Sequence, residues 1–439
     1  MTGDGALQFH AATHTGRVRG HNEDNFLVDR RLGLFVVADG MGGHNAGEVA
    51  SALCVRTVHD EVKRHRGLVE SYAAGQQISA REVVSLLEHA AQRASAVIHD
   101  EASTDPEKRG MGTTCVMLLV AGPTAFVAHA GDSRVYLRRD DKLECLTDDH
   151  TVYNELVRRG KLSLEQIEKV AQKNAITRAV GIYERVEVDT LLVETVPGDT
   201  FLLCSDGLHG YVRTDDELGE MLSAPPEGAV EELVRFANDR GGRDNVTAVV
   251  VRIGGEDDGE RARKLAQKRA ILAKMPLFSR LSERELLRVL QVVSVRAALD
   301  GEEIIQEGER GDALFVVLSG TLRVSQGGAV LSRLGEGAHV GEMALIRNEP
   351  RSATVTSEGP SELAVITRVD FLDIVRRDHE LAIKLLWQFL GVLAGRLDGA
   401  NRQLRSTREG SSVLDEGSEV VLEDESEHDR PTLPFIEPA

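Results

Sequence analysis

Cysteines, long apolar runs and basic residues are scarce in this sequence, and each shortage excludes a class of protein. The four cysteines lie far apart and never form Cys-x-x-Cys, which argues against a disulfide framework or zinc site and predicts buried thiols in a reducing compartment. No segment approaches the ~18 apolar residues of a membrane span, and the N-terminus has neither a basic start nor an apolar stretch. We therefore expect a cytoplasmic protein with no membrane partner. The cysteines are Cys54, Cys115, Cys145 and Cys204.

The deficit of basic residues amounts to a formal net charge of −19. A nucleic-acid surface needs clustered Lys and Arg, so nucleic acid is not an expected partner. An acidic balance suits a metal-binding role or a solvating role and does not distinguish the two. The rest of the composition is typical of a globular protein, with 41% hydrophobic and 28% charged residues, and 439 residues suggest two or three domains.

The N-terminal half alternates short apolar runs with stretches of helical spacing, which predicts an α+β domain over residues 1–254. The apolar runs are bounded by Gly, Asp and Asn and indicate strands buried on both faces. These predicted strands cover residues 33–39, 113–120, 200–206 and 245–252. Helical spacing of Val, Leu, Ile and Ala covers residues 47–64 and 80–101.

A turn-rich acidic break at residues 254–259 separates this domain from a second one. We predict a charged helical linker over 255–275, a second domain over 276–404, and a disordered acidic tail over 405–439 that cannot bury enough apolar surface to fold. Short strands spaced by Gly-containing turns predict that the second domain is a small antiparallel β-roll with helices. Its predicted strands are 302–305, 313–318, 321–325 and 364–367. Its predicted helices are one over 281–295, one that begins at about 369, and a longer one that ends at about 404.

Three aspartates stand at the ends of predicted strands in the first domain. Asp39 and Asp206 each follow an apolar run, and Asp244 comes just before another. The glycines after Asp39 let the backbone approach a metal closely. With no His or Cys partner nearby, the carboxylates form an oxygen-ligand set that suits Mg²⁺ or Mn²⁺ rather than zinc. Taken singly, each Asp-Gly pair is foremost a turn dipeptide.

Five motifs occur together and in order along residues 9–253. They are Gly16-Arg-Val-Arg-Gly-His-Asn-Glu-Asp24, Asp39-Gly-Met-Gly-Gly43, Gly131-Asp-Ser-Arg134, Ser205-Asp-Gly207 and Asp244-Asn245. This set resembles the motifs of the metal-dependent protein phosphatases of the type-2C (PPM) family. The resemblance implies a central β-sandwich flanked by helices, a two-metal site at one end of it, and hydrolysis of phosphoserine and phosphothreonine in proteins, with serine/threonine kinases among the candidate partners.

The resemblance also implies roles for the aspartates. Asp39 would bridge two Mn²⁺ or Mg²⁺ ions, Gly40 would contribute its carbonyl, and Asp206 and Asp244 would complete the shell of one ion. Two such ions roughly 3.5–4 Å apart lower the pKa of a shared water, so that a hydroxide attacks the phosphorus in line. The expected catalytic residues are Arg19, Asp39, Asp206 and Asp244.

Further residues complete the site that the resemblance implies. Asp132 would hold a third, weaker metal ion, and Glu23 and Asp24 would orient metal-bound waters. A guanidinium suits the phosphate dianion because it binds two oxygens at once. We assign that role to Arg19 from its position before Asn22-Glu-Asp24, with Arg17 as the competing choice and an exposed surface arginine as the plain alternative.

One position departs from the pattern of many eukaryotic relatives. They carry a His where this chain has Met41, and that His is thought to protonate the leaving alkoxide; bacterial relatives commonly have Met there. Met41 cannot donate a proton, so water on the metal or another group would do so. His44 is near in sequence but fits a surface position better. Residues 147–181 resemble the mobile flap of the family, which either touches substrate or simply packs.

The second domain contains a segment with the chemistry of an anion site. Gly341-Glu-Met-Ala-Leu-Ile-Arg-Asn-Glu-Pro-Arg-Ser-Ala-Thr354 pairs the start of a short helix with an arginine ten residues on. It closely resembles the phosphate-binding cassette of cyclic-nucleotide-binding domains, where Arg351 would neutralise the phosphate and Glu342 would accept from a ribose hydroxyl. Ser352 does not decide between cAMP and cGMP. The expected nucleotide-binding residues are Gly341, Glu342, Met343, Ala344, Arg351 and Ser352.

The last predicted helix, over about 380–404, carries an apolar seam. Its members alternate spacings of three and four, which fits a two-helix coiled coil and hence a homodimer, or packing against its own β-roll. They are Ile383, Leu386, Leu390, Leu393, Leu397, Ala400 and Leu404. Trp387, the single tryptophan, lies on this helix and suits a core or interface role better than a lid over the nucleotide.

The leading hypothesis is a protein phosphatase whose activity or location is set by a cyclic nucleotide. A second hypothesis keeps the phosphatase but makes the C-terminal domain a ligand-free docking or dimerisation module. A third makes the chain a nucleotide sensor built on a dead phosphatase fold, against which the complete set of aspartates argues. A transcription factor is not expected, because no helix-turn-helix follows the last helix.

Overall fold

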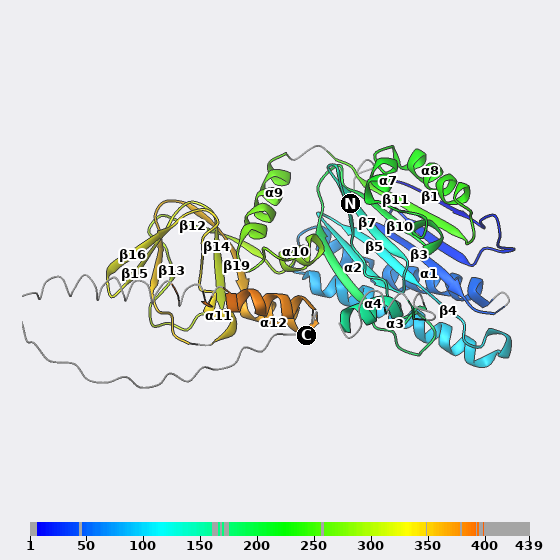
Figure 1. Cartoon of the computed structure of the whole chain (residues 1–439), viewed down its shortest axis with the longest axis horizontal. Helices are drawn as coiled ribbons and strands as arrows, with labels where there is room; N and C mark the ends of the chain where they lie inside the picture. The colour runs from blue at the N-terminus through cyan, green and yellow to red at the C-terminus, as the bar shows by residue number, and fades with distance from the viewer. Residues whose placement is uncertain are drawn as a thin grey trace, which may run out of the picture. The chain divides into compact units, whose positions relative to one another are not determined.

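The computed structural model describes residues 7–43, 46–159, 175–255, 259–347, 349–377 and 380–391, together with isolated residues beside these ranges. The chain divides into two compact units, Met1–Leu385 and Leu386–Ala439. The predicted acidic tail, 405–439, lies outside the described residues. The predicted domain limits therefore stay predictions, although the kinds of structure on either side of residue 254 are clear in Figure 1.

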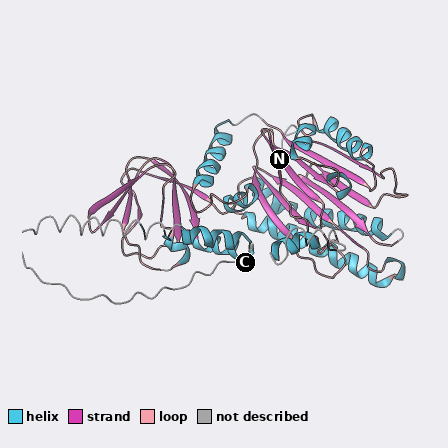
Figure 2. Ribbon diagram, in the orientation of Figure 1, coloured by secondary structure: helices cyan, strands magenta, loops and turns pink. Residues whose placement is uncertain are grey.

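Two antiparallel sheets form the centre of the N-terminal part (Figure 2). One sheet has the order β1-β11-β10-β7-β8, with bounds Leu7–His14, Val246–Ile253, Thr200–Cys204, Arg134–Arg139 and Lys142–Cys145. The other has the order β2-β3-β5-β6-β9, with bounds Asp24–Asp29, Leu34–Met41, Cys115–Ala121, Thr124–Ala130 and Asp189–Glu194, and the short β4 (Gly112–Thr113) pairs with β3. Strands β5 and β6 are buried along their whole length, which the uninterrupted apolar run at 113–120 predicted for β5 alone.

Helices cover the sheets because each buries one apolar stripe. On α1 (Ala46–Arg64), buried residues recur every fourth position, at Ala50, Cys54, Val58 and Val62, and pack in one core with β3 and α3 (Ala80–Thr104). On the other sheet, α8 (Pro226–Asp239) packs on β1 and β11. The remaining helices here are α2 (Arg66–Ala73), the 3₁₀ helix η1 (Pro106–Lys108), α4 (Val152–Arg159), α6 (Asp206–His209) and α7 (Asp215–Met221). The predicted β-sandwich flanked by helices is confirmed.

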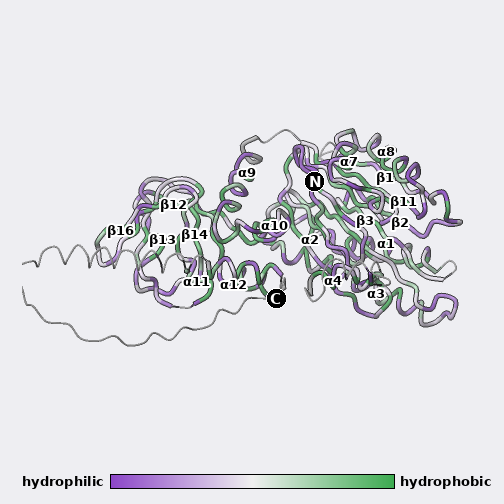
Figure 3. The backbone as a smooth tube through the Cα atoms, viewed as in Figure 1, coloured by the Kyte–Doolittle hydropathy of each residue, from purple (hydrophilic) through white to green (hydrophobic). Residues whose placement is uncertain are grey.

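The C-terminal part is a β-roll of two four-stranded sheets. One has the order β12-β19-β14-β17, with bounds Ser294–Ala298, Ser361–Thr367, Ala313–Ser319 and His339–Val340. The other has the order β13-β18-β15-β16, with bounds Glu303–Ile305, Thr354–Ser357, Leu322–Gln326 and Ala329–Leu334. The helices are α9 (Gly259–Lys274), α10 (Glu283–Leu290), α11 (Met343–Ile346) and α12 (Arg368–Arg377). In Figure 3, hydrophobic segments recur along these strands as they do in the sandwich.

The structure corrects two sequence predictions. The helix predicted over 281–295 is wrong at its end, because α10 stops at Leu290 and Ser294–Ala298 pairs with β19 instead. Pairing with a buried neighbour outweighs local helix propensity there. The strand predicted to reach Asp206 ends at Cys204, and Asp206 is the first residue of α6.

Two predictions from composition have counterparts in the structure. All four cysteines are free thiols; Cys54, Cys115 and Cys204 are buried and Cys145 is half-buried. Over the residues that the structure describes, no helix combines the length and the hydrophobicity that crossing a bilayer requires.

Candidate metal centre

The centre begins where β2 meets β3. Asp24 and Asp39 are register partners at one end of this strand pair, and the Gly40 N–H donates to the Glu23 carbonyl at 3.2 Å. The main chain of Asp39 is held on both sides, since its N–H donates to Thr114 Oγ1 at 2.9 Å and its carbonyl accepts from the Thr114 N–H at 2.8 Å. The backbone that carries Asp39 is thus fixed before any ligand arrives.

Three more aspartates reach this end of the sandwich from other elements. Asp206 opens α6 just after β10, Asp244 precedes β11, and Asp132 follows β6. Burial raises the pKa of Asp39 well above its usual range, and the negative charges of Asp24, Asp206, Asp132 and Asp244 raise it further. The structure therefore brings together the aspartates that the sequence analysis selected.

The neighbouring carboxyls are perturbed in the same direction. Burial, followed by the charge of Asp206, raises the pKa of Asp132 to about 7. Burial also raises the pKa of Asp24 to about 6, although hydrogen bonds from Thr247 and Ser205 oppose the shift. The pKa values of Asp206 and Glu23 are raised as well, in both cases mainly by burial. A nearby cation would lower these pKa values, because it favours the ionised form of each carboxyl. The raised pKa values therefore suit a group of residues that binds a cation.

Orphaned oxygens test whether the residues fit a divalent ion. Glu23 Oε1, Asp24 Oδ1 and Asp206 Oδ1 are buried and have no hydrogen-bond partner among the described residues. Buried carboxylate oxygens are normally paired or bound to metal. A side chain at Gly40 would place its Cβ 2.0 Å from the Gly47 carbonyl oxygen, so only glycine fits there. The donor set is all oxygen and fits Mg²⁺ or Mn²⁺.

Two arginines precede the centre, and they have different partners. Arg19 Nη2 donates to Asp244 Oδ2 at 2.7 Å, and Arg19 Nη1 lies 3.9 Å from Glu23 Oε2. Arg17 instead pairs with Asp239 at 2.6 Å, and both of those side chains are largely exposed. Of the two candidates named from sequence, Arg19 is the one that faces the carboxylates.

Several supporting residues have no role in the sequence analysis. The Asn245 side chain accepts from the Glu23 N–H at 2.8 Å and donates to the Thr15 and His21 carbonyls, both at 2.9 Å, which ties the Arg19 loop to β11. Ser205 and Thr247 donate to Asp24 Oδ2 at 2.8 and 2.6 Å. Ser205 and Asn245 belong to the motifs quoted above, and their position next to Asp206 and Asp244 was the signal that could have identified them. Thr247 lies inside an apolar strand, where nothing in the sequence marks it.

Two sequence predictions near the centre are only partly visible. Met41 is the last residue of β3 and is half-buried, while His44 lies outside the described residues. Of the flap predicted over 147–181, the structure describes 147–159 and 175–181, but not 160–165, 167–168 or 171–174. Whether the flap touches substrate stays a prediction.

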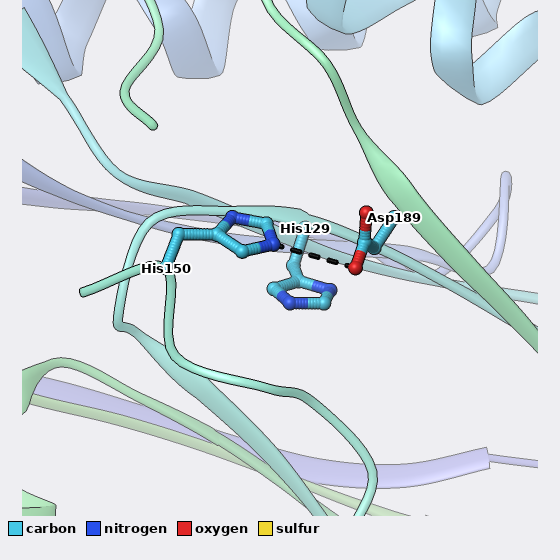
Figure 4. A group of neighbouring side chains, drawn as sticks. All are labelled: His129, His150 and Asp189. Carbon is cyan, nitrogen blue, oxygen red and sulfur yellow. Dashed lines mark ion pairs between the residues drawn. The ribbon is translucent and has the colours of Figure 1, made fainter. Parts of the chain in front are cut away.

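A second group of side chains offers metal-ligand atoms. His129, His150 and Asp189 have ligand atoms within 4.8 Å of one another (Figure 4). The Gly131 N–H donates to His150 Nδ1 at 3.2 Å, so a neutral His150 carries its proton on Nε2, the atom that faces Asp189 at 3.4 Å. Arg178 already supplies a cation to Asp189 at 2.9 Å. This group is a closed hydrogen-bond network rather than a metal site.

In the predicted nucleotide-binding segment, main-chain carbonyls hold the Arg351 side chain in place. Arg351 donates to the Ala313 carbonyl at 2.8 Å and to the Gly341 carbonyl at 3.2 Å. A Cβ at Gly341 would lie 2.6 Å from Arg351 Nη1, and one at Gly311 would lie 2.1 Å from Nε, so both glycines make room for the guanidinium. Glu342 is buried at the start of α11. Met343 is partly exposed, Ala344 is buried and Ser352 is exposed.

Comparisons with known proteins agree with this division. Residues 14–249 match the family model described as protein phosphatase 2C, and residues 295–378 match the cyclic nucleotide-binding domain. The serine/threonine phosphatase stp of Listeria innocua is 37% identical over 244 residues, which is 54% of this chain and 93% of that protein.

Solved structures resemble the same part of the chain. The crystal structure of the Mycobacterium tuberculosis serine/threonine phosphatase PstP/Ppp is 33% identical, covers 57% of this chain and 100% of its own, and has a TM-score of 0.50. The catalytic domain of PstP in complex with two manganese ions is 32% identical, covers 57% of this chain and 99% of its own, and has a TM-score of 0.48.

Proposed function

The chain belongs to the protein phosphatase 2C family and is a serine/threonine phosphatase, and on that premise we propose which residues perform the reaction and how it is regulated. Asp39, Gly40, Asp206 and Asp244 hold two divalent ions, Mn²⁺ or Mg²⁺. Asp132 holds a third ion more weakly, and Glu23 and Asp24 orient water at the centre. The observation that carries this proposal is the set of buried, unpartnered carboxylate oxygens around Asp39.

The bound ions supply Lewis-acid activation of water and neutralise charge on the phosphoryl group. The chain's own residues do the rest. Arg19 is anchored by Asp244 at 2.7 Å and presents a guanidinium at the mouth of the centre, where it binds phosphate oxygens and offsets the charge that grows on them. Met41 has no dissociable proton, so the proton for the leaving seryl oxygen comes from water or another group.

Metal removal tests the catalytic proposal. The purified chain should not hydrolyse p-nitrophenyl phosphate or a phosphoserine peptide in EDTA, and Mn²⁺ should restore both activities. A chain that is equally active in EDTA and Mn²⁺ contradicts the metal centre. A chain inactive in both, although folded, supports the dead-phosphatase alternative instead.

We further propose that the C-terminal domain binds a cyclic nucleotide, cAMP or cGMP, through Arg351 and Glu342. What supports this is that the guanidinium is already oriented by two carbonyls and accommodated by two glycines. Calorimetry with cAMP and cGMP on the full chain and on Arg351→Ala tests it. Arg351→Ala removes the guanidinium that would donate two hydrogen bonds to the nucleotide phosphate, so it should weaken nucleotide binding by about a hundredfold. If neither nucleotide binds the wild type, the domain is a ligand-free docking or dimerisation module.

Regulation by that nucleotide requires that it bind two states of the chain with different affinity. We propose such coupling between the nucleotide and the phosphatase rate. If saturating cAMP and cGMP both leave the rate and the phosphopeptide KM unchanged, the regulatory proposal fails while the phosphatase stands. Phosphoproteins are the partners of a phosphatase; that serine/threonine kinases are among them is a proposal.

A homodimer through the 380–404 helix is also proposed. Three members of the apolar seam are more than half exposed, namely Ile383, Leu386 and Leu390. Trp387 is also more than half exposed. Exposed apolar side chains at helical spacing suit a second copy of the helix. Sedimentation of the wild type against Leu386→Glu should show loss of a dimer; a wild type that sediments as a monomer at all concentrations contradicts it.

A further inference from the structure

Two arginines of α10 hold the segment that supports the Asp132 loop. We propose that Arg284 and Arg288 are positioning residues for this loop, and that the placement of α10 thereby sets how tightly a divalent cation binds at Asp132. This inference rests on the proposed function, because it takes Asp132 as a cation ligand. It goes beyond that function by naming the element outside the catalytic domain that controls one of its sites.

The support for the loop comes from residues 149 and 150. The His150 N–H donates to the Gly131 carbonyl at 3.0 Å, and the Gly131 N–H donates back to His150 Nδ1 at 3.2 Å. Asp149 binds the guanidinium of Arg134 through both oxygens, each at 2.8 Å. Asp132 lies between Gly131 and Arg134, which these contacts hold in place. A shift of residues 149 and 150 therefore moves the Asp132 backbone.

The preceding two residues continue the same contact. Thr147 Oγ1 accepts from the Val135 N–H at 3.1 Å, and the Asp148 carbonyl accepts from His129 Nε2 at 2.9 Å. His129 lies on β6, whose end leads into the Asp132 loop. Residues 147–150 therefore contact the strands on both sides of the loop and act as its brace.

The arginines hold this brace at Asp148. Arg284 Nη1 donates to Asp148 Oδ1 and to the Thr147 carbonyl, the latter at 3.4 Å, and Arg288 Nη2 lies 3.9 Å from Asp148 Oδ2. The two arginines are four residues apart and so share one face of α10. The Asp148 side chain is 19% exposed, which removes it from the class of surface ion pairs that contribute little.

The position of α10 is in turn fixed from its N-terminus. Ser282 and Glu285 form a capping box, and Glu285 Oε1 also accepts from Lys384 Nζ at 2.8 Å. Lys384 lies in the helical segment that follows α12 along the chain, so α10 contacts both Asp148 and that segment. Helix α10 lies outside both matched family models, which end at 249 and begin at 295. These contacts therefore lie in the segment between the two matched ranges.

Mn²⁺ binding to the full-length chain tests the inference without using activity. Free Mn²⁺ is counted by electron paramagnetic resonance across a titration of wild type, Arg284→Ala, Arg288→Ala and Arg280→Ala, the last an exposed arginine just before the same helix. Removing support from a metal-binding loop should weaken the weakest Mn²⁺ site about tenfold in Arg284→Ala, and less in Arg288→Ala, whose contact is longer. The tight sites and Arg280→Ala should be unchanged.

Asp148→Asn supplies the second line of the test and replaces Arg284→Ala if that variant does not fold. Asp148→Asn should weaken the same site, and the double variant should be no weaker than either single one. Asp132→Asn separates the possible failures. If it leaves the weakest site intact, the proposed third cation is wrong; if it removes the site while Arg284→Ala and Asp148→Asn both match Arg280→Ala, the cation stands and the positioning role is overturned.

Discussion

The two ligand sites proposed for this chain hold charged side chains in opposite ways. Around Asp39, several carboxyls are packed together, their charges raise one another's pKa, and three of their oxygens have no partner among the described residues. In the C-terminal domain, Arg351 donates to two main-chain carbonyls and fits a space that two glycines leave open. In the proposed function, the first site needs cations to offset its negative charge, whereas the second has its donor oriented before an anion binds.

The difference predicts different coupling of ligand to stability. Cations at the aspartate centre remove repulsion that is present in the native state alone, so metal binding and folding free energy are strongly linked. An anion at Arg351 meets a donor that is already oriented, so it adds binding energy without relieving strain. Substitutions that remove charge should therefore stabilise one site and weaken the other.

The largest effect should come from Asp39→Asn. If Asp39 holds the ions as proposed, its loss should lower the Mn²⁺-dependent rate by about a thousandfold, which corresponds to several kcal/mol of transition-state stabilisation. In EDTA the same variant should be more stable than wild type by about 1–3 kcal/mol, because a buried repulsive charge is gone. Phosphopeptide hydrolysis and calorimetric unfolding in EDTA measure the two.

A matched control exists in the same domain. Asp199 is buried and accepts two hydrogen bonds from Arg139, each at 2.7 Å. Asp199→Asn removes half of a satisfied buried pair and should destabilise the chain by about 3–5 kcal/mol. If Asp39→Asn and Asp199→Asn shift stability in the same direction in EDTA, the contrast between a repelled and a paired aspartate is wrong.

The pH dependence of stability should show the same repulsion. Asp132 has a native pKa of about 7 against an ordinary value of 3.8, so between these values the native state binds more protons than the unfolded state. In EDTA its contribution is unfavourable to folding and grows as pH rises from about 4 to about 7, reaching a few kcal/mol. Below about 4, both states are protonated and the contribution vanishes.

The contribution of Asp132 to this pH dependence is measured as the difference in stability between the wild type and Asp132→Asn. Buried His129 and His209 have pKa values lowered to about 4 by burial, and they give stability a slope of opposite sign over part of the same range. The Asp132→Asn variant keeps both histidines. Its excess stability over wild type in EDTA should rise from near zero at pH 4 to its maximum near pH 7, and an excess that is flat with pH contradicts the assignment.

Arg19 and Arg17 sharpen the comparison within the metal centre. Arg19→Ala should lower kcat/KM for a phosphopeptide by about a hundredfold, since it removes a donor to the reacting phosphate. Arg17→Ala removes an exposed ion pair with Asp239 and should change the rate less than about twofold. Equal losses in both variants would restore Arg17 as the phosphate-binding candidate.

The sequence was sufficient to predict which aspartates the fold brings close together. Asp39, Asp206 and Asp244 stand at the ends of predicted strands with glycine or asparagine beside them, a pattern that the sequence alone displays. The division into a helix-flanked sandwich and a β-roll followed from the change in the spacing of apolar residues at residue 254. Those features are local in sequence and repeat a known family pattern.

Contacts between distant segments could not be predicted. Thr247 donates to Asp24 across 223 positions, and nothing in its apolar strand distinguishes it. The pair of Arg284 with Asp148 joins residues 136 positions apart, and each alone is an ordinary charge in a charged stretch. Ser294 and Val295, the first two residues of β12, were predicted as helix because their pairing partners in β19 lie 71 and 69 positions away. Long-range partners determine such features, and a single sequence does not name them.

The smallest predicted effect separates two glycines of the C-terminal domain. Gly341 and Gly359 have nearly the same backbone conformation, with φ of +86° and +88°, so alanine should destabilise either position by about 1–3 kcal/mol. Their surroundings differ, because a Cβ at 341 meets the Arg351 guanidinium at 2.6 Å and one at 359 meets no described atom within 4 Å. Gly341→Ala should displace the guanidinium and weaken cyclic-nucleotide binding about tenfold, whereas Gly359→Ala should leave it unchanged. Calorimetry on both variants decides the matter: if they lose affinity equally, backbone strain and not the arginine governs the site, and the contrast between a strained aspartate centre and a pre-built arginine site no longer holds.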